Sequence, residues 1–127
     1  MKNILLIEPD RVLAGTYTRT LEGAGYSVRH VVGAEQAIRL ADTAKPDAVI
    51  ISLEMARHNG VEFLYEFRSY SEWRHIPALV LTSTPHTDLL DATILREQLG
   101  VEAVLVRSQT HADDLLRTLR LIATRKA

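Results

Sequence analysis

The chain has 127 residues, with 15 lysines and arginines, 16 aspartates and glutamates, and no cysteine. This length suits a single domain spanning residues 1–127, and the net charge of −1 gives no strong field that would favour DNA, RNA or an anionic membrane. Without cysteine, the chain can form no disulfide, thiolate metal site or cysteine nucleophile. The apolar run Ile4–Ile7 is too short for a signal peptide or a membrane span, so we expect a cytoplasmic protein.

Short apolar runs alternate with amphipathic stretches along the whole chain, which predicts alternating strands and helices. In chain order these are strand Asn3–Ile7, helix Asp10–Gly25, strand Tyr26–Val32, helix Gly33–Lys45, strand Asp47–Ser52, helix Gly60–Tyr70, strand Ile76–Thr84, helix His86–Gly100, strand Val101–Val106 and helix Thr110–Lys126. We expect Gly23 and Gly25 to stop the first helix, Gly100 to stop the fourth, and Thr110 to cap the last helix.

Five strands alternating with five helices imply a parallel sheet that is covered on both faces. Right-handed crossovers narrow this arrangement to a doubly wound α/β fold, in which the functional site lies beyond the carboxyl ends of the strands. The residues that follow the strands and could act there are Glu8, Pro9, Asp10, Ser52, Glu54, Thr82 and Arg107.

The order and spacing of several segments resemble the receiver domains of two-component response regulators. The resemblance runs from Lys2 to about Ala123 and lies in "ILLIEPD", "LEGAGYSV", "AEQAI", "KPDAVIISLEM", "NGVEFL", "IPALVLTS", "LGVEAVLVR" and "LLRTLRLI". It implies a flavodoxin-like (βα)5 fold with strand order 2-1-3-4-5. The segment between Thr82 and Gly100 looks a few residues longer than is usual in that family.

The resemblance also assigns a family role to each strand end. Two acids after the first strand hold Mg²⁺, and an aspartate after the third strand accepts a phosphoryl group from a histidine kinase. A hydroxyl after the fourth strand senses the phosphoryl group, and a lysine after the fifth strand pairs with it. In this chain Glu8 keeps the first acid, whereas Pro9 replaces the second and Ser52 replaces the phosphoacceptor. Thr82 keeps the hydroxyl, and Arg107 replaces the lysine.

These replacements remove the chemistry that phosphoryl transfer needs. A serine hydroxyl is no substitute for a carboxylate nucleophile, because its high pKa calls for a neighbouring base. Mg²⁺ prefers carboxylate oxygens, and two are lost at Pro9 and Ser52. We therefore expect a degenerate receiver, or pseudo-receiver, with no catalytic residue, no cofactor, weak or absent Mg²⁺ binding, and a structural fork between Arg107 and Glu8.

Other interpretations of the same residues stay open. Glu8, Asp10 and Glu54 could form a replacement metal site, although Asp10 could instead cap the first helix and Glu54 could point outward. An anion between Arg107, Ser52 and Thr82 is conceivable. The five histidines show no metal-ligand spacing and are expected at the surface. Trp73 and Tyr70 could form an exposed partner contact or could be packing residues.

The function that we predict is a phosphorylation-independent protein–protein interaction module in two-component or phosphorelay signalling. Its partner would be a signalling protein or a second copy of the chain, and we expect no binding of nucleic acid or membrane. The possible interaction face comprises Leu89, Leu90, Val104 and Arg107. The alternative is a receiver-type switch driven by serine phosphorylation or by a ligand in the strand-end pocket. An enzyme is disfavoured, because "EPDRVLAG" is not a glycine-rich phosphate loop and no nucleophile–base pair is visible.

Overall fold

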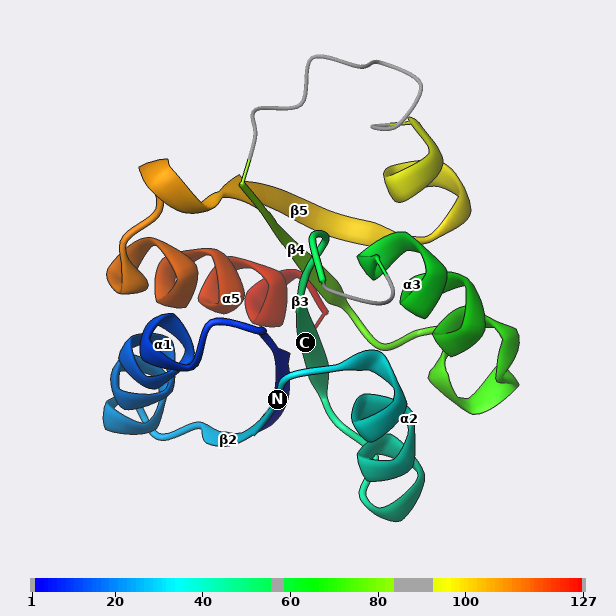
Figure 1. The fold of residues 1–127 in the computed structure, drawn as a ribbon, viewed down its shortest axis with the longest axis horizontal. Helices are drawn as coiled ribbons and strands as arrows, with labels where there is room; N and C mark the ends of the chain where they lie inside the picture. Colours follow the sequence, from blue (N-terminus) through cyan, green and yellow to red (C-terminus); the bar gives the residue numbers. More distant parts are fainter. Residues whose placement is uncertain (1, 56–58, 84–92, 127) are drawn as a thin grey trace.

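The fold is a five-stranded parallel sheet with helices on both faces, seen in a computed structural model (Figure 1). The structure describes residues 2–55, 59–83 and 93–126. The elements are β1 (Asn3–Ile7), α1 (Arg11–Gly23), β2 (Ser27–Val31), α2 (Ala34–Thr43), β3 (Ala48–Ser52), α3 (Gly60–Ser69), η1 (Ser71–Trp73), β4 (Ala78–Thr82), η2 (Ile94–Gln98), β5 (Val101–Val106), η3 (Arg107–Gln109) and α5 (Ala112–Lys126).

The strand order is β2-β1-β3-β4-β5, which confirms the predicted doubly wound sheet. The register pairs Ile7 with Ile51 and Ser52 with Leu81, so β1, β3 and β4 end at the same edge of the sheet. Thr82 pairs with Val106, which brings the end of β5 to that edge as well. The residues that follow these strands are therefore neighbours in space although they are far apart in sequence.

Alternating strand side chains build two separate cores, one on each face of the sheet. On one face, Leu5, Val49 and Val80 pack with α2 and with Phe63 and Phe67 of α3. On the opposite face a second cluster joins the strands to α1 and α5, through Ile4, Leu6, Ile50, Leu79, Tyr17, Leu21, Leu115 and Leu119. The central strands are buried on both faces, which explains their unbroken apolar sequences.

Several helix boundaries differ from the sequence predictions. α1 ends at Gly23, and Gly25 then takes a φ of 99°, a left-handed conformation that favours glycine. Gly100, with a φ of 61°, makes the corresponding turn into β5. The prediction of Thr110 as the cap of the last helix is wrong, because its hydroxyl donates to the Val106 carbonyl and α5 begins at Ala112.

The predicted helix His86–Gly100 is described only in part. Residues 84–92, including His86, Leu89 and Leu90, lie outside the described residues. From Ile94 to Gln98 the chain forms a π-helical turn, with Leu95 buried against the core. The amide of Leu99 donates to the carbonyl of Ile94, the five-residue spacing of a π-helix, whereas the sequence pattern predicted an α-helix.

Candidate functional site

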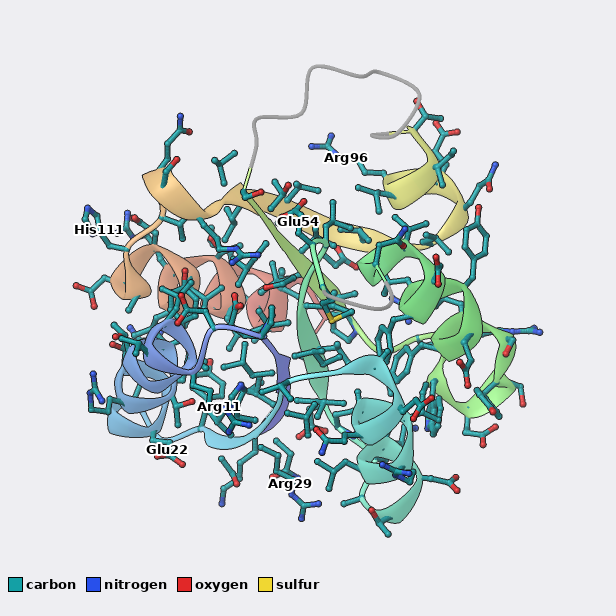
Figure 2. The ribbon with its side chains drawn as sticks, in the orientation of Figure 1. Arg11, Glu22, Arg29, Glu54, Arg96 and His111 are labelled. Carbon is teal, nitrogen blue, oxygen red and sulfur yellow. The ribbon has the colours of Figure 1, made fainter. Side chains whose placement is uncertain are left out.

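The candidate site lies where β1, β3, β4 and β5 end, and it gathers four of the predicted residues around one arginine. Glu8 follows β1, Ser52 ends β3, Thr82 ends β4, and Arg107 follows β5. Glu54, labelled in Figure 2, lies two residues beyond β3 and approaches the same cluster from the solvent side. Side-chain contacts link these five residues into one polar network.

Glu8 is the buried anion of this network, with an exposed fraction of 0%. Its Oε1 accepts a hydrogen bond from the Ser52 hydroxyl at 2.6 Å, and its Oε2 accepts one from the Asp10 amide at 2.9 Å. Nη1 of Arg107 lies 3.5 Å from the same Oε2 and supplies the compensating charge. The carboxylate is thus satisfied from within the protein, as a buried charge must be.

Glu54 is the second anion, and it holds the end of β4. Its Oε2 accepts a hydrogen bond from the Thr82 hydroxyl at 2.8 Å, and its Oε1 accepts one from the Ser83 amide at 2.7 Å. Partial burial alone would raise the pKa of Glu54, but the bonds from Ser83 and Thr82 and the charge of Arg107 outweigh it and lower the pKa. Glu54 therefore faces the site although 45% of its side chain is exposed, and the suggestion that it points away from the site is wrong.

Arg107 bridges the two carboxylates rather than forming a fork with Glu8 alone. Nη1 contacts Glu8 at 3.5 Å and Nη2 contacts Oε1 of Glu54 at 3.6 Å. The predicted two-bond fork is therefore wrong, because the second guanidinium nitrogen faces the other anion. Within the described part of the chain, the buried Nε of Arg107 has no hydrogen-bond partner. The guanidinium works here as a shared counter-ion with a part-exposed side chain.

Pro9 and Asp10 contribute little to the centre of the network. Asp10 caps α1, since its Oδ1 accepts hydrogen bonds at 3.0 Å from the amides of both Val12 and Leu13. This confirms the capping interpretation of Asp10 against its role in a metal site. Pro9 has neither a side-chain donor nor a side-chain acceptor, and its backbone serves only to join Glu8 to the cap.

The carboxylates that could bind a cation already have partners within the protein. Glu8 is engaged by Ser52, Asp10 and Arg107, and Pro9 offers no oxygen ligand from its side chain. A cation placed beside Glu8 would meet the guanidinium of Arg107 at close range, and like charges repel. Among the described residues, no group of three or more histidine, aspartate or glutamate side chains is placed to hold a metal ion.

Three further residues lie at or near the network, and no sequence pattern assigned them a role there. The Ser83 amide belongs to the network, but a backbone donor leaves no mark in the sequence. His30 is half-buried rather than at the surface, and its Nε2 lies 2.8 Å from the Glu8 carbonyl oxygen. Tyr17 is buried below the site, where burial and then the charge of Glu8 raise its pKa.

The predicted interaction face is described only at two of its four positions. Leu89 and Leu90 lie outside the described residues. Val104 is half-buried and packs against the core on the α2–α3 side of the sheet, and Arg107 turns into the polar network.

Trp73 is a packing residue, since its ring stacks on Phe67 with centroids 5.0 Å apart and is 3% exposed.

The family is established by comparison with known sequences. The model of the response regulator receiver domain matches residues 4–120, so the chain belongs to this family. The chain is therefore a receiver domain of two-component signal transduction.

Within the described residues, no helix is both long and apolar enough to cross a lipid bilayer.

Curated relatives share part of their length with this chain. The KDP operon transcriptional regulatory protein KdpE of Escherichia coli is 29% identical over 83 residues, which cover 65% of this chain and 36% of KdpE. The response regulator MprA of Mycolicibacterium vanbaalenii is 34% identical over 80 residues, 63% of this chain and 34% of MprA. The transcriptional regulatory protein PdtaR of Mycobacterium tuberculosis is 27% identical over 125 residues, 98% of this chain and 58% of PdtaR. The chain thus spans between a third and somewhat over half of these relatives.

Solved structures agree with the fold. The chemotaxis response regulator CheY4 of Vibrio cholerae superposes with a TM-score of 0.84 at 25% identity, over 96% of this chain and 98% of CheY4. A CheY-like receiver domain protein of Methanospirillum hungatei gives the same TM-score of 0.84 at 16% identity, over 98% of this chain and 95% of that one. The second likeness bears on the fold alone.

Proposed function

We propose that this chain is a pseudo-receiver, a receiver domain that binds a protein partner without phosphoryl transfer at its strand-end site. It would be a single domain over residues 1–127 that performs no catalysis and works in the cytoplasm. The observation that carries the proposal is the internal network, in which Glu8, Ser52, Glu54, Thr82 and Arg107 satisfy one another. The groups that would meet a phosphoryl group and its metal are already engaged.

Ser52 is a poor acceptor for a phosphoryl group in this setting. Ser52 is 0% exposed, and its hydroxyl donates a hydrogen bond to Oε1 of Glu8 at 2.6 Å. A carboxylate so close could in principle act as a base. However, the pair of anions formed by Glu8 and Glu54 would oppose the approach of a negatively charged phosphoryl donor. This arrangement supports a structural role for Ser52.

Glu54 supports a fixed signalling state. The family resemblance gives the hydroxyl after the fourth strand the task of sensing a phosphoryl group, and that hydroxyl here donates to Glu54 at 2.8 Å. The Ser83 amide and Nη2 of Arg107 face the same carboxylate. We propose that Glu54 holds these donors as a bound phosphoryl group would, so that the domain presents one partner-binding state constantly.

The partner is proposed to be a signalling protein or a second copy of the chain. β5 is an edge strand of the sheet, and most of its residues are only half-buried. The unpaired backbone groups of an edge strand are available for contact with another chain. Leu89, Leu90 and Val104 remain the predicted contact residues, with Arg107 at the end of the same strand.

A switch driven through this site by another input is less well supported. Phosphorylation of Ser52 would require a kinase to reach a hydroxyl that is fully buried. An anion between Arg107, Ser52 and Thr82 would have to displace two carboxylates from their donors. Both events call for the network to open first, at the cost of leaving Glu8 uncompensated.

The experiment that tests the proposal is treatment with acetyl phosphate and Mg²⁺, followed by intact-mass measurement. We expect no phosphoryl adduct on the wild type. A matched variant carrying Pro9→Asp, Ser52→Asp and Arg107→Lys restores the residues of the family and calibrates the assay. Sedimentation of the wild type should give the same oligomeric state before and after treatment. A stoichiometric adduct on the wild type would contradict the proposal.

A further inference from the structure

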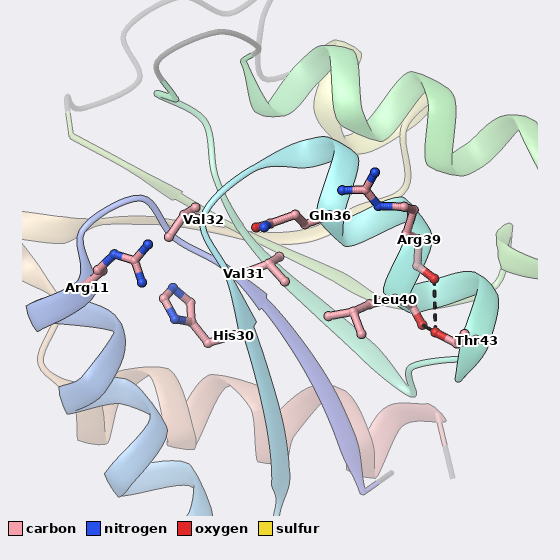
Figure 3. A pocket seen from close by; sticks show the side chains of 8 residues that line it. All are labelled: Arg11, His30, Val31, Val32, Gln36, Arg39, Leu40 and Thr43. Atoms are coloured by element: carbon pink, nitrogen blue, oxygen red, sulfur yellow. Dashed lines mark hydrogen bonds between the residues drawn. The ribbon is translucent and has the colours of Figure 1, made fainter.

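A separate cavity of about 490 Å³ lies between the start of α1, the end of β2 and α2. Its size falls in the range of small-molecule sites, roughly 300–1,000 Å³. Figure 3 shows Arg11 on the α1 side and Arg39 on the α2 side, with His30 and Gln36 between them. The valine and leucine side chains that complete the lining, Val32 and Leu40 among them, give it an apolar wall.

The cavity is open to solvent, and two exposed arginines, Arg11 and Arg39, give it a positive lining. No aspartate or glutamate lines it. Within the part of the chain that the structure describes, neither the Arg11 nor the Arg39 guanidinium takes part in a hydrogen bond or an ion pair. Arg39 has Glu35 four residues before it and Asp42 three residues after it on α2, yet it pairs with neither. Two unpaired guanidinium groups around one hollow favour an anion.

We propose that this cavity binds an organic phosphate of nucleotide size. Guanidinium groups match the oxygens of phosphate in a planar, two-bond geometry, and two of them suit a mono- or polyphosphate. The volume leaves room for a group larger than inorganic phosphate. The apolar wall around Val32 and Leu40 would cover a base, and the Gln36 amide offers both a donor and an acceptor to its edge.

The cavity also touches the polar network at one point. The Nε2 of His30 lies 2.8 Å from the carbonyl oxygen of Glu8. Because a carbonyl oxygen can only accept, Nε2 carries a proton and donates this hydrogen bond. The same ring lines the cavity, and the side chain of Glu8 lies in the network. A ligand that contacts His30 would therefore touch a side chain that is hydrogen-bonded to the backbone of Glu8, a residue of the strand-end site. The proposal goes beyond the function proposed above and holds whether or not Ser52 accepts a phosphoryl group.

The test is a calorimetric titration of the intact chain with AMP, ATP, GTP, inorganic phosphate and citrate, at constant ionic strength and without divalent cations. We expect at least one nucleotide to bind with a dissociation constant below about 1 mM and inorganic phosphate to bind at least tenfold more weakly. Arg11→Gln and Arg39→Gln should each weaken binding by roughly tenfold, because each removes a charged hydrogen-bond donor. The matched control Arg120→Gln, an exposed charge on α5, should leave binding unchanged.

Amide chemical shifts of the wild type give a second readout that needs no variant. Binding should move the signals of His30 and Val32 and leave the exposed end of α5 unmoved. The proposal is overturned if no nucleotide binds in this range, or if Arg11→Gln and Arg39→Gln bind as the wild type does. Equal affinity for inorganic phosphate or for citrate would also overturn it, since the cavity would then read charge alone.

Discussion

The Oε2 of Glu54 lies 2.8 Å from the hydroxyl of Thr82, across 28 residues of sequence. Its Oε1 takes the next backbone amide, that of Ser83, at 2.7 Å. One carboxylate therefore fixes both the side chain at the end of β4 and the start of the segment that follows it. The family resemblance assigns the sensing of a phosphoryl group to the hydroxyl after the fourth strand, and in this chain Glu54 accepts a hydrogen bond from that hydroxyl.

Replacing Arg107 by methionine should destabilise the fold. Glu8 would remain buried with hydrogen bonds but without a cation. Losing one partner of a buried ion pair costs roughly 3–5 kcal/mol, and we expect about 2 kcal/mol here because Arg107 is partly exposed. Arg107→Lys should recover at least half of the loss. Urea unfolding provides the measurement.

The matched control for this substitution is Arg117→Met. Arg117 pairs with Asp114 at 3.1 Å on the surface of α5, with 68% of its side chain exposed. An exposed pair of this kind contributes about 0–1 kcal/mol. If Arg107→Met and Arg117→Met lower the free energy of unfolding equally, Arg107 is not the counter-ion of Glu8.

Acid should weaken the fold through Glu54. Its pKa is lower in the folded protein than in the unfolded chain, so the stability it adds is present above about pH 4.3. That stability is lost as the pH falls through the folded-state pKa. We expect the free energy of unfolding to drop below about pH 4.3, and to drop less steeply in Glu54→Gln. Identical pH profiles for the two proteins would contradict the network.

Asp47, which lies at the amino-terminal ends of the strands, should contribute to the same loss of stability in acid. The hydrogen bond from the Asn3 amide is the largest influence on its pKa, which is lowered despite partial burial. Its Oδ2 accepts from the amides of Lys2 and Asn3, each at 2.8 Å. Asp47→Asn should therefore flatten the acid limb a little further without changing the strand-end site, which amide chemical shifts can verify.

Gly60→Ala should be costly, because α3 begins in contact with the end of β3. A Cβ at Gly60 would lie 2.9 Å from the Cα of Leu53 and 2.9 Å from the carbonyl oxygen of Ser52. Both atoms belong to the backbone and cannot move aside easily, so we expect a loss of about 1–3 kcal/mol in unfolding free energy. Gly23→Ala is the control, since a Cβ there meets nothing within 4 Å. Equal midpoints for the two variants in thermal melts would refute the close approach.

Tyr17→Phe should leave stability unchanged or raise it by about 1 kcal/mol. The Tyr17 hydroxyl is buried and has no hydrogen-bond partner among the described residues, and an unsatisfied buried hydroxyl is unfavourable. Tyr65→Phe is the comparison, because the exposed Tyr65 hydroxyl donates to Gln98 at 3.2 Å. A loss of more than about 1 kcal/mol in Tyr17→Phe would mean that the hydroxyl is satisfied by buried water.

The sequence predicted the fold well, because apolar strands covered on both faces leave a strong pattern. Ser52, Thr82 and Arg107 were placed at one edge simply because parallel strands end together. The partners of these side chains leave no such pattern in the sequence. Whether Glu54 turns inward depends on the distance between the loop after β3 and the end of β4, which is set by strand register and not by local sequence. The bridge made by Arg107 has the same origin.

The cavity at Arg11 and Arg39 shows the same limit. The two arginines lie 28 residues apart, on the first turn of α1 and within α2, and each alone looks like an ordinary surface charge. Only the pairing of β1 with β2, which sets His30 beside Glu8, brings them around one hollow. A helix N-terminal cap such as Asp10, by contrast, is local and could be read directly from its spacing.

The most direct test of the central claim is the amide spectrum of Thr82 and Ser83 during titration with beryllofluoride and Mg²⁺. If Glu54 already holds these groups, the titration should move neither signal of the wild type. The substitution Glu54→Gln, without any beryllofluoride, should shift both signals relative to the wild type. Glu66→Gln, an exposed acid on α3, serves as the control and should shift neither. Saturable shifts at Thr82 and Ser83 in the wild type would show that the site still accepts a phosphoryl analogue, and would contradict the account.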